Sequence, residues 1–529
     1  MEQDNLLTDP ILGLESPAGF ERTDLPGLLA ALGDDRALSL PNLQRHQEDA
    51  FHIFLCYLAA AVLCRQSAKD PVQDAAFWRK SVRELTHSEG VSDDSAWTLV
   101  VSDPSRPAFM QPPTPGSEGF AHFSLKAETP DALDLLPTAK NHDVKSSRSA
   151  RSHLEDWVYA LVSLQTMSGF FGSGNYGIAR MNGGYGSRPV VALIPVGTWG
   201  RRWRSDVARL LEIREELLGG AWHYQPDGVV LTWVPSWDRK SSIAVSSLDP
   251  FFVEVCRAVR LMQDKERLVT WAATSKTPRI AAGDALGVLG DPWIPVKLEG
   301  KKGPQALTVG PAGLSAELLR NLLFFEDGGY RPAAMQRPPA GFTEGPVRFS
   351  VSVFVRGQGT TDGFQHREIT IPPQARTLLF SSGPEREALA ARSRRALEHA
   401  GLLEIRALKP AVLSFLQGAG GSQTLNWDQR QINTWWQKAA RAFRASWSAE
   451  LFPWLWRTAE ETNDEEADRA WLLSLRESAQ AALDTVVREY PRRQGRRFRS
   501  RAVAEDIFIG SLLKHFPQLK EASRGATSN

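Results

Sequence analysis

A glycine-rich run from Ser168 to Gly177 has the residue types and spacing that point most directly to chemistry. Gly172, Gly174 and Gly177 fit the G-x-G-x-x-G spacing of a dinucleotide-binding turn, but that turn needs a strand before it and a helix after it. The preceding residues have helical spacing, and residues 181–186 are again rich in glycine. We therefore reject a dinucleotide-binding fold. Two interpretations stay open: a loop whose backbone approaches a ligand or nucleic acid, and a linker with a strained turn.

Two basic runs have the composition of phosphate-binding segments. Residues 140–151 hold four Lys or Arg and one Asp, and residues 492–501 hold six Arg and no acid. The planar guanidinium group of arginine matches a phosphate, although a solvated surface loop explains either run as well. A third, shorter basic run spans residues 201–204. The residues that we expect to contact nucleic-acid backbones are Arg148, Arg151, Arg492, Arg493, Arg496 and Arg497.

The sequence does not assemble a catalytic site. It has no Walker A loop, no HExxH zinc motif and no GxSxG nucleophile motif. His142-Asp143 lacks the further distant ligands that a metal-dependent phosphohydrolase would need. The three cysteines, Cys56, Cys64 and Cys256, are too few for a disulfide scaffold or a four-cysteine zinc site. We therefore favour a binding protein over an enzyme and expect neither a metal nor a cofactor.

Composition places the chain among ordinary globular proteins. Its 529 residues carry a formal net charge of +1, with 42% hydrophobic and 23% charged residues. This length allows roughly two to four domains at ~150 residues each. The longest apolar run, residues 50–64, is shorter than the ~20 residues of a membrane helix, and the N-terminus lacks the order of a signal peptide. We therefore expect a cytoplasmic protein, which the low cysteine content also favours.

Apolar spacing divides the chain into two parts. The first part mixes helical and strand patterns with loops broken by glycine and proline, whereas the pattern after Pro372-Pro373 is helical nearly to the end. This predicts an α+β protein, with an irregular mixed α/β N-terminal domain (1–375) and an all-α C-terminal bundle of four or five helices (376–529). Expected helices cover 43–64, 75–86, 153–167, 464–490 and 501–516, and expected strands cover 189–196, 229–234 and 348–355.

Several short motifs follow one another in an order that is typical of one family. They are Asn5-Leu-Leu-Thr-Asp-Pro10, Leu38-Ser-Leu-Pro41, Ala108-Phe-Met-Gln111, the glycine-rich run and the segment from Gly357 to Arg367. With the chain length and the C-terminal helices, they show that the chain resembles the large subunit (CasA family) of the type I-E CRISPR Cascade surveillance complex. The resemblance covers nearly the whole chain, and it implies an α/β N-terminal domain followed by a C-terminal four-helix bundle. It departs from the family after Pro10, where Ile-Leu-Gly replaces Trp-Ile-Pro, and it lacks the four-cysteine zinc knuckle of some members.

The resemblance implies a function in antiviral defence. Subunits of this family are not catalytic: they recognise a short motif beside the target (the PAM) in double-stranded DNA, mainly from the minor groove. They promote duplex opening and R-loop formation, and they recruit a helicase–nuclease. The implied partners are the guide CRISPR RNA, target double-stranded DNA, the other Cascade backbone and small subunits, and that helicase–nuclease, in a prokaryotic cytoplasm. The alternative is a stand-alone nucleotide-binding enzyme that uses the glycine-rich loop.

The resemblance also assigns residues to the family's nucleic-acid-binding elements. The family's glycine loop corresponds to Gly169, Phe170, Phe171, Gly172, Ser173, Gly174 and Asn175. Its wedge corresponds to Gln358, Gly359 and Thr360. Its lysine finger corresponds to Lys276 or Arg279, and the sequence does not decide between them. The loop that anchors the subunit near the 5′ end of the guide corresponds to Lys140, Asn141, His142, Val144 and Lys145.

Overall fold

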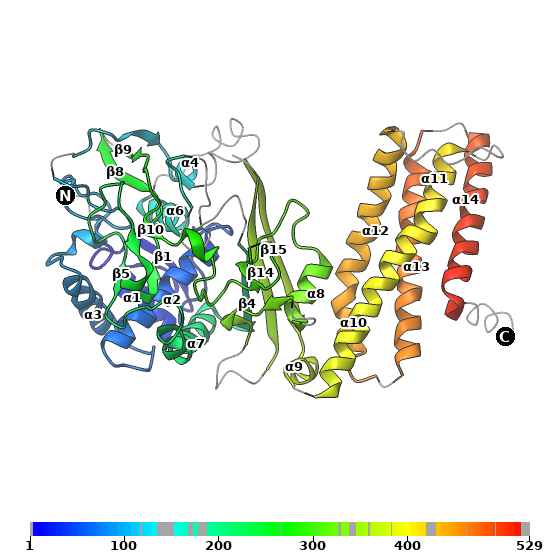
Figure 1. The fold of residues 1–529 in the computed structure, drawn as a ribbon, viewed down its shortest axis with the longest axis horizontal. Coiled ribbons are helices and arrows are strands. Elements are labelled where there is room, and N and C mark those ends of the chain that lie inside the picture. Colours follow the sequence, from blue (N-terminus) through cyan, green and yellow to red (C-terminus); the bar gives the residue numbers. More distant parts are fainter. Residues whose placement is uncertain are drawn as a thin grey trace. The chain divides into compact units, whose positions relative to one another are not determined.

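The computed structural model divides the chain into two compact units (Figure 1). Unit 1 comprises Met1–Leu314 and Phe325–Thr370, and unit 2 comprises Ser315–Phe324 and Ile371–Asn529. The sequence alone predicts a single boundary between residues 375 and 376. The residues that the structure describes are 4–116, 119–134, 153–167, 173–177, 188–265, 267–300, 302–325, 329–337, 345–357, 360–381, 383–418, 430–461, 463–491 and 494–519.

The core of unit 1 surrounds the apolar helix α2 (Glu48–Arg65). Three elements pack against it: α6 (Leu154–Met167), α7 (Trp199–Leu218) and β7 (Leu248–Val253). Because these neighbours cover α2 on several sides, almost every residue from 50 to 63 is buried. The apolar run in the sequence is therefore explained by a core helix.

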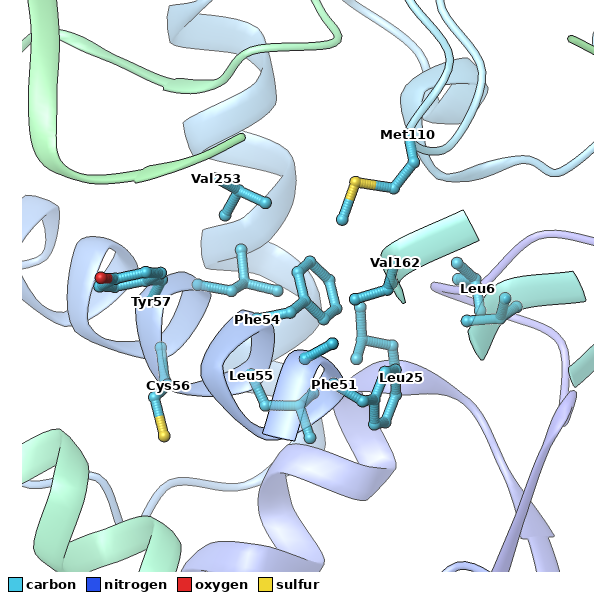
Figure 2. Close-up of a cluster of buried hydrophobic side chains, with 14 of the residues drawn as sticks. Leu6, Leu25, Phe51, Phe54, Leu55, Cys56, Tyr57, Met110, Val162 and Val253 are labelled. Carbon is cyan, nitrogen blue, oxygen red and sulfur yellow. The ribbon is translucent and has the colours of Figure 1, made fainter. Parts of the chain in front are cut away.

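Figure 2 shows how the core is built around α2. Phe51, Phe54 and Leu55 of α2 lie in one cluster with Val162 of α6 and Val253 of β7. Burying apolar area in this way stabilises the fold by about 25 cal/mol per Å² removed from water. Among the described helices, none is both long enough and apolar enough to cross a membrane.

The α+β class predicted from the sequence is confirmed, and most predicted elements of unit 1 are present with shifted ends. Predicted helices at 43–64, 75–86 and 153–167 correspond to α2, α3 (Ala75–Ser88) and α6. Predicted strands at 189–196, 229–234 and 348–355 correspond to β4 (Val190–Pro195), β5 (Val229–Leu231) and β14 (Val347–Gly357). The sequence analysis missed α7, whose first turn it interpreted only as a basic run.

Small sheets rather than one large sheet complete unit 1, which agrees with the irregular sequence. Among the described residues, the strands form six such sheets. The longest strands, β14 and β15 (Thr360–Ile371), neighbour each other, and β14 pairs antiparallel with β4 from Val347↔Pro195 to Ser352↔Val190. A second sheet has the order β3-β9-β8.

The remaining elements of unit 1 are short. The helices are α1 (Leu25–Gly33) and α4 (Pro130–Asp134). The strands are β1 (Leu12–Ser16), β2 (Gly19–Thr23), β3 (Ser124–Ala127), β6 (Ile243–Ala244), β8 (Ala258–Asp264), β9 (Arg267–Ala273), β10 (Ile280–Ala281), β11 (Val296–Lys297), β12 (Gln305–Ala306) and β13 (Tyr330–Arg331).

Unit 2 is helical, as the sequence predicted. Its main helices are α10 (Pro384–Leu403), α12 (Arg430–Arg457), α13 (Asp464–Glu489) and α14 (Gln494–His515), and the short α11 (Lys409–Gln417) continues α10. Two shorter helices, α8 (Ala316–Phe324) and α9 (Pro373–Phe380), join them. The guanidinium group of Arg320 in α8 donates to Ala390 O at 3.0 Å and to Ser393 Oγ at 2.9 Å, both in α10. These bonds explain why a segment from the middle of the chain belongs to the bundle.

A wide π-helical turn, Glu404–Leu408, joins α10 to α11 without a break. Pro410 provides the physical reason, because proline lacks an N–H and its ring clashes with the carbonyl four residues earlier in an ordinary helix. In the wider turn, the amide of Lys409 instead donates to Glu404 O. The two helices therefore form one continuous helical segment. In the described part of the bundle there are four such long segments: α10–α11, α12, α13 and α14.

Candidate nucleic-acid interface

The second half of the glycine-rich run lies against a segment 100 residues further along the chain. The amide of Ser275 donates to the carbonyl oxygen of Gly174 at 3.1 Å. The hydroxyl of Tyr176 donates to the carbonyl oxygen of Lys276 at 2.9 Å. The structure therefore brings Ser173, Gly174 and Asn175 of the predicted glycine loop next to Lys276, one of the two predicted finger residues.

Gly174 is required at its position for two reasons. Its φ angle is +81°, a left-handed conformation that side chains rarely adopt. A Cβ atom on Gly174 would also lie 2.6 Å from the Cβ atom of Thr274. The backbone of the run can therefore approach residues 274–276 closely only because residue 174 is glycine. The other predicted loop residues, Gly169, Phe170, Phe171 and Gly172, lie outside the described residues.

The structure separates the two candidates for the finger. Lys276 is exposed, whereas Arg279 is only 3% exposed and its guanidinium group lies 5.5 Å from the ring centre of Trp237. The guanidinium nitrogens of Arg279 donate to the carbonyl oxygens of Thr232, Pro235 and Ser236. Burial lowers the pKa of Arg279 to about 10, which leaves it charged at neutral pH. Arg279 is therefore held inside the fold, and Lys276 is the exposed candidate for the finger.

A third segment, Asp238–Ser242, lies beside Lys276, and the sequence analysis did not single it out. The amide of Lys276 donates to the carbonyl oxygen of Arg239 at 2.8 Å. The hydroxyl of Ser242 donates to the carbonyl oxygen of Pro278 at 2.6 Å. Three segments that are distant in sequence thus meet at one place in unit 1.

Gln165 fixes the base of the glycine-rich run. It is fully buried near the end of α6, and its side-chain amide makes four hydrogen bonds. Nε2 donates to the carbonyl oxygens of Met110 and Arg257, and Oε1 accepts from the amides of Cys256 and Arg257. The sequence contained a signal for this residue, since a glutamine is unexpected among the apolar residues of a core helix.

The base of the predicted guide-anchoring loop is also held by side chains. Asp134, at the end of α4, accepts a hydrogen bond from His46 Nε2 at 2.6 Å and from Gln47 Nε2 at 3.1 Å. Both partners lie just before α2, so the loop starts from a fixed point on the core of unit 1. The predicted loop residues lie outside the described residues, as do the predicted backbone contacts next to them: Lys140, Asn141, His142, Val144, Lys145, Arg148 and Arg151.

The predicted wedge falls between the end of β14 and the start of β15 in the sequence. Gln358 and Gly359 lie outside the described residues, and Thr360 is the first residue of β15. The sequence analysis predicted strand structure only for residues 348–355, so β15 is a new element here. At about 3.3 Å per residue, strands of this length extend over roughly 35 Å from Val347 to Gly357 and from Thr360 to Ile371.

The second basic run forms a helix and is not a loop. Residues 494–501 make up the first two turns of α14, in which Arg496 is exposed and Arg497 Nη2 donates to Tyr490 O at 3.1 Å. Arg501 pairs with Glu505 at 2.6 Å and with Asp484 at 3.7 Å. Arg496 is therefore exposed, and its contact with a phosphate stays a prediction. The charge of Arg501 is neutralised by Glu505 and Asp484. Arg492 and Arg493 lie outside the described residues.

The third basic run belongs to α7 and has acidic partners, of which Asp49 is buried. Arg202 Nη2 lies 3.0 Å from Asp49 Oδ1, and Arg204 Nη2 lies 3.3 Å from Asp35 Oδ2. Only 13% of the Arg202 side chain is exposed. A buried ion pair of this kind fixes the position of helices rather than offering charge to a ligand.

His52, Cys56 and Asp206 form a buried group whose potential metal-ligand atoms lie within 4.8 Å of one another. Hydrogen bonds explain this group: Nδ1 of His52 accepts from the indole N–H of Trp199 at 2.9 Å, and Nε2 donates to Asp206 Oδ2 at 2.7 Å. Burial lowers the pKa of His52 and raises the pKa of Cys56 well above its usual value. A neutral imidazole held on both nitrogens and a protonated thiol indicate a structural network.

The structure agrees with rejecting the dinucleotide-binding fold. The glycine-rich run follows α6, whereas the dinucleotide fingerprint follows a strand. The run therefore lacks the preceding strand at whose carboxyl end such folds bind their cofactor.

Comparison with known proteins identifies the fold. Neither a protein-family model nor a curated protein matches the sequence. Among solved structures, the CasA of Thermus thermophilus matches with a TM-score of 0.64 and 14% identity, over 97% of this chain and 100% of that one. The Cse1 of Acidimicrobium ferrooxidans matches with a TM-score of 0.59 and 16% identity, over 97% and 98%.

A chain of a structure described as a CRISPR RNA-guided surveillance complex also matches, with a TM-score of 0.60 and 14% identity, over 96% of this chain and 99% of that one. The three matches extend through both units rather than one of them, so a shared single domain does not account for them. The protein therefore has the fold of the CasA (Cse1) proteins over nearly its whole length.

Proposed function

We propose that the chain is the large subunit of a type I-E CRISPR Cascade complex and that it recognises the PAM in double-stranded DNA. The CasA fold over 97% of the chain supports this role. So does the similarity to a chain of an RNA-guided surveillance complex. The partners in this role are the guide CRISPR RNA, target double-stranded DNA and the other Cascade subunits.

The contact between the glycine-rich run and Lys276 is the observation that carries the proposal. A backbone without side chains is thin enough to enter a minor groove, and a lysine beside it can reach an acceptor on a base edge or a phosphate. Separately, each segment has an ordinary structural explanation. The hydrogen bonds Ser275–Gly174 and Tyr176–Lys276 hold the two segments side by side. A bare glycine backbone beside an exposed lysine is the combination that this proposal needs for reading a groove.

The later steps of the proposed function follow from PAM binding. Once the duplex is held at the PAM, the wedge at the turn of β14 and β15 separates the strands so that the guide RNA pairs with the target, forming an R-loop. The exposed arginine at the start of α14 contacts a nucleic-acid backbone, and the complex recruits a helicase–nuclease for antiviral defence. In this scheme the chain binds and positions nucleic acids, and it needs no cofactor.

Purification from the native host tests the proposal. The tagged chain should copurify with several protein subunits and with short RNAs that share a repeat-derived 5′ end, which sequencing of the bound RNA would show. The complex should bind duplexes with one flanking motif more tightly than duplexes without it. A chain that purifies alone, without RNA, and binds a mononucleotide would instead support the enzyme alternative.

A further inference from the structure

The segment Asp238–Ser242 folds as a tight polar turn around one carboxylate. Oδ1 of Asp238 accepts hydrogen bonds from the amide of Lys240 at 2.9 Å, the amide of Ser241 at 2.8 Å and the hydroxyl of Ser241 at 2.7 Å. These bonds, led by that of the Ser241 hydroxyl, lower the pKa of Asp238 to about 2. The turn is therefore a defined structure and not a loose loop.

Hydrogen bonds on both sides attach this turn to the residues around Lys276. Besides the bonds from Lys276 to Arg239 and from Ser242 to Pro278, the amide of Ile243 donates to Arg279 O at 2.8 Å. That last bond begins the parallel pairing of β6 with β10, which fixes the register of the two segments. The exposed side of the turn is therefore held at a constant position relative to Lys276.

The side chains of the turn are divided between the interior and the surface. Arg239 is 8% exposed, and its guanidinium group lies 5.7 Å from the ring centre of Phe123. Lys240, Ser241 and Ser242 are exposed. The two hydroxyls already donate, Ser241 to Asp238 and Ser242 to Pro278 O, so Lys240 is the donor that this side of the turn offers to a phosphate.

The charge around the turn favours a polyanion. The segments 238–242 and 274–279 hold four basic residues and one acid. The acid, Asp238, accepts hydrogen bonds from the turn's own amides and hydroxyl and interacts electrostatically with Lys240, and the side chains of Lys240 and Lys276 are exposed. Arg279 stays charged beneath this surface, because a pKa of about 10 is well above neutral pH.

We infer that the turn Asp238–Ser242 is a further DNA-contacting segment, in which Lys240 binds a phosphate of the duplex that Lys276 contacts. This inference rests on the proposed function and deepens it. A lysine on a phosphate fixes the position of the protein on the duplex and carries no sequence information. Lys240 therefore contributes affinity for any duplex, whereas the glycine-rich run and Lys276 contribute the preference for the PAM.

Substitution of Lys240 by glutamine tests the inference in the assembled complex. Binding of duplexes with and without the PAM should weaken by the same factor. The slope of log affinity against log salt concentration should decrease by about 0.9, the value for one lost phosphate contact. Lys80→Gln is the control, since Lys80 is an exposed lysine on α3 that lies 3.6 Å from Glu84 and belongs to neither of these two segments. It should leave both affinities and the slope unchanged.

Substitution of Asp238 by asparagine tests whether the negative charge in this turn weakens the binding of DNA. Asparagine keeps the side-chain oxygen that accepts the turn's amides but removes the negative charge, so both duplexes should bind more tightly. Weaker binding by Asp238→Asn, or an unchanged salt slope in Lys240→Gln, would overturn the inference. The proposed function fails separately, if the wild-type complex shows no preference for any flanking motif.

Discussion

The hydroxyl of Tyr176 donates a hydrogen bond to the backbone carbonyl oxygen of Lys276 at 2.9 Å. Because the bond goes to the backbone, it fixes where the lysine side chain begins and does not use its ammonium group. Together with the bond from Ser275 to Gly174, it joins the glycine-rich run to the candidate finger. The two elements should therefore respond to mutation as one site.

Gly174 should be essential for binding duplex DNA at the PAM. Gly174→Val introduces a Cβ that would lie 2.6 Å from Thr274 Cβ, at a φ of +81°. We expect PAM-dependent duplex binding to be abolished. Binding of complementary single-stranded DNA should remain, because pairing with the guide supplies that affinity.

Gly90→Val is the control for backbone strain in this experiment, since Gly90 has a φ of +98° but no atom within 4 Å of its would-be Cβ. It should leave the binding of both substrates intact. Equal loss of duplex and single-stranded binding in Gly174→Val would mean that the run is structural, and normal duplex binding would mean that it does not read the groove.

Lys276 and Arg279 should give opposite results when replaced by methionine. Lys276→Met should lower PAM-dependent binding without changing the melting temperature, because the side chain is exposed. Arg279→Met should lower the melting temperature, because it leaves the buried carbonyl group of Thr232 without this donor, at a cost of ~1–3 kcal/mol. Thermal unfolding and duplex binding of both variants check this; a stable Arg279→Met protein with a binding defect would restore Arg279 as the finger.

The basic start of α14 should contact nucleic acid through Arg496. Arg496→Gln should lower the salt dependence of target binding by about one unit per lost phosphate contact, whatever the target sequence. Arg501→Gln is the matched control, since Glu505 and Asp484 already neutralise Arg501. Equal slopes in the two variants would contradict a phosphate contact at Arg496 and favour a solvated helix face.

Trp436 should be structural. Its side chain is 7% exposed in α12, and truncating a buried tryptophan to alanine costs about 3–5 kcal/mol of unfolding free energy. Trp436→Ala should therefore reduce the yield of soluble protein and the melting temperature. Trp435→Ala should cost less, because Trp435 is only partly buried, against Tyr490 and Lys438. Normal melting of Trp436→Ala, combined with failed complex assembly, would show that this residue faces a partner.

Local sequence patterns predicted most of the fold. The apolar spacing of α2, α3, α6 and α13 and the Val-rich strands β4 and β14 depend on neighbouring residues, so a single sequence reveals them. The change to a helical bundle after Pro372-Pro373 is likewise a property of composition and periodicity. The placement of α8 with the bundle was not predictable in this way, because it depends on Arg320 meeting α10, about 70 residues away.

The candidate site, like the fold, depended partly on the sequence and partly on the tertiary structure. The sequence by itself determined that Gly174 and Lys276 belong to elements worth testing, through their residue types and the family resemblance. Only the tertiary structure decided that Gly174 bonds to Ser275, that Lys276 bonds to Arg239 beside Lys240, and that Arg279 is buried. The physical reason is that these facts depend on hydrogen bonds and burial between segments separated by about 35 to 100 residues, which no local pattern of side chains encodes.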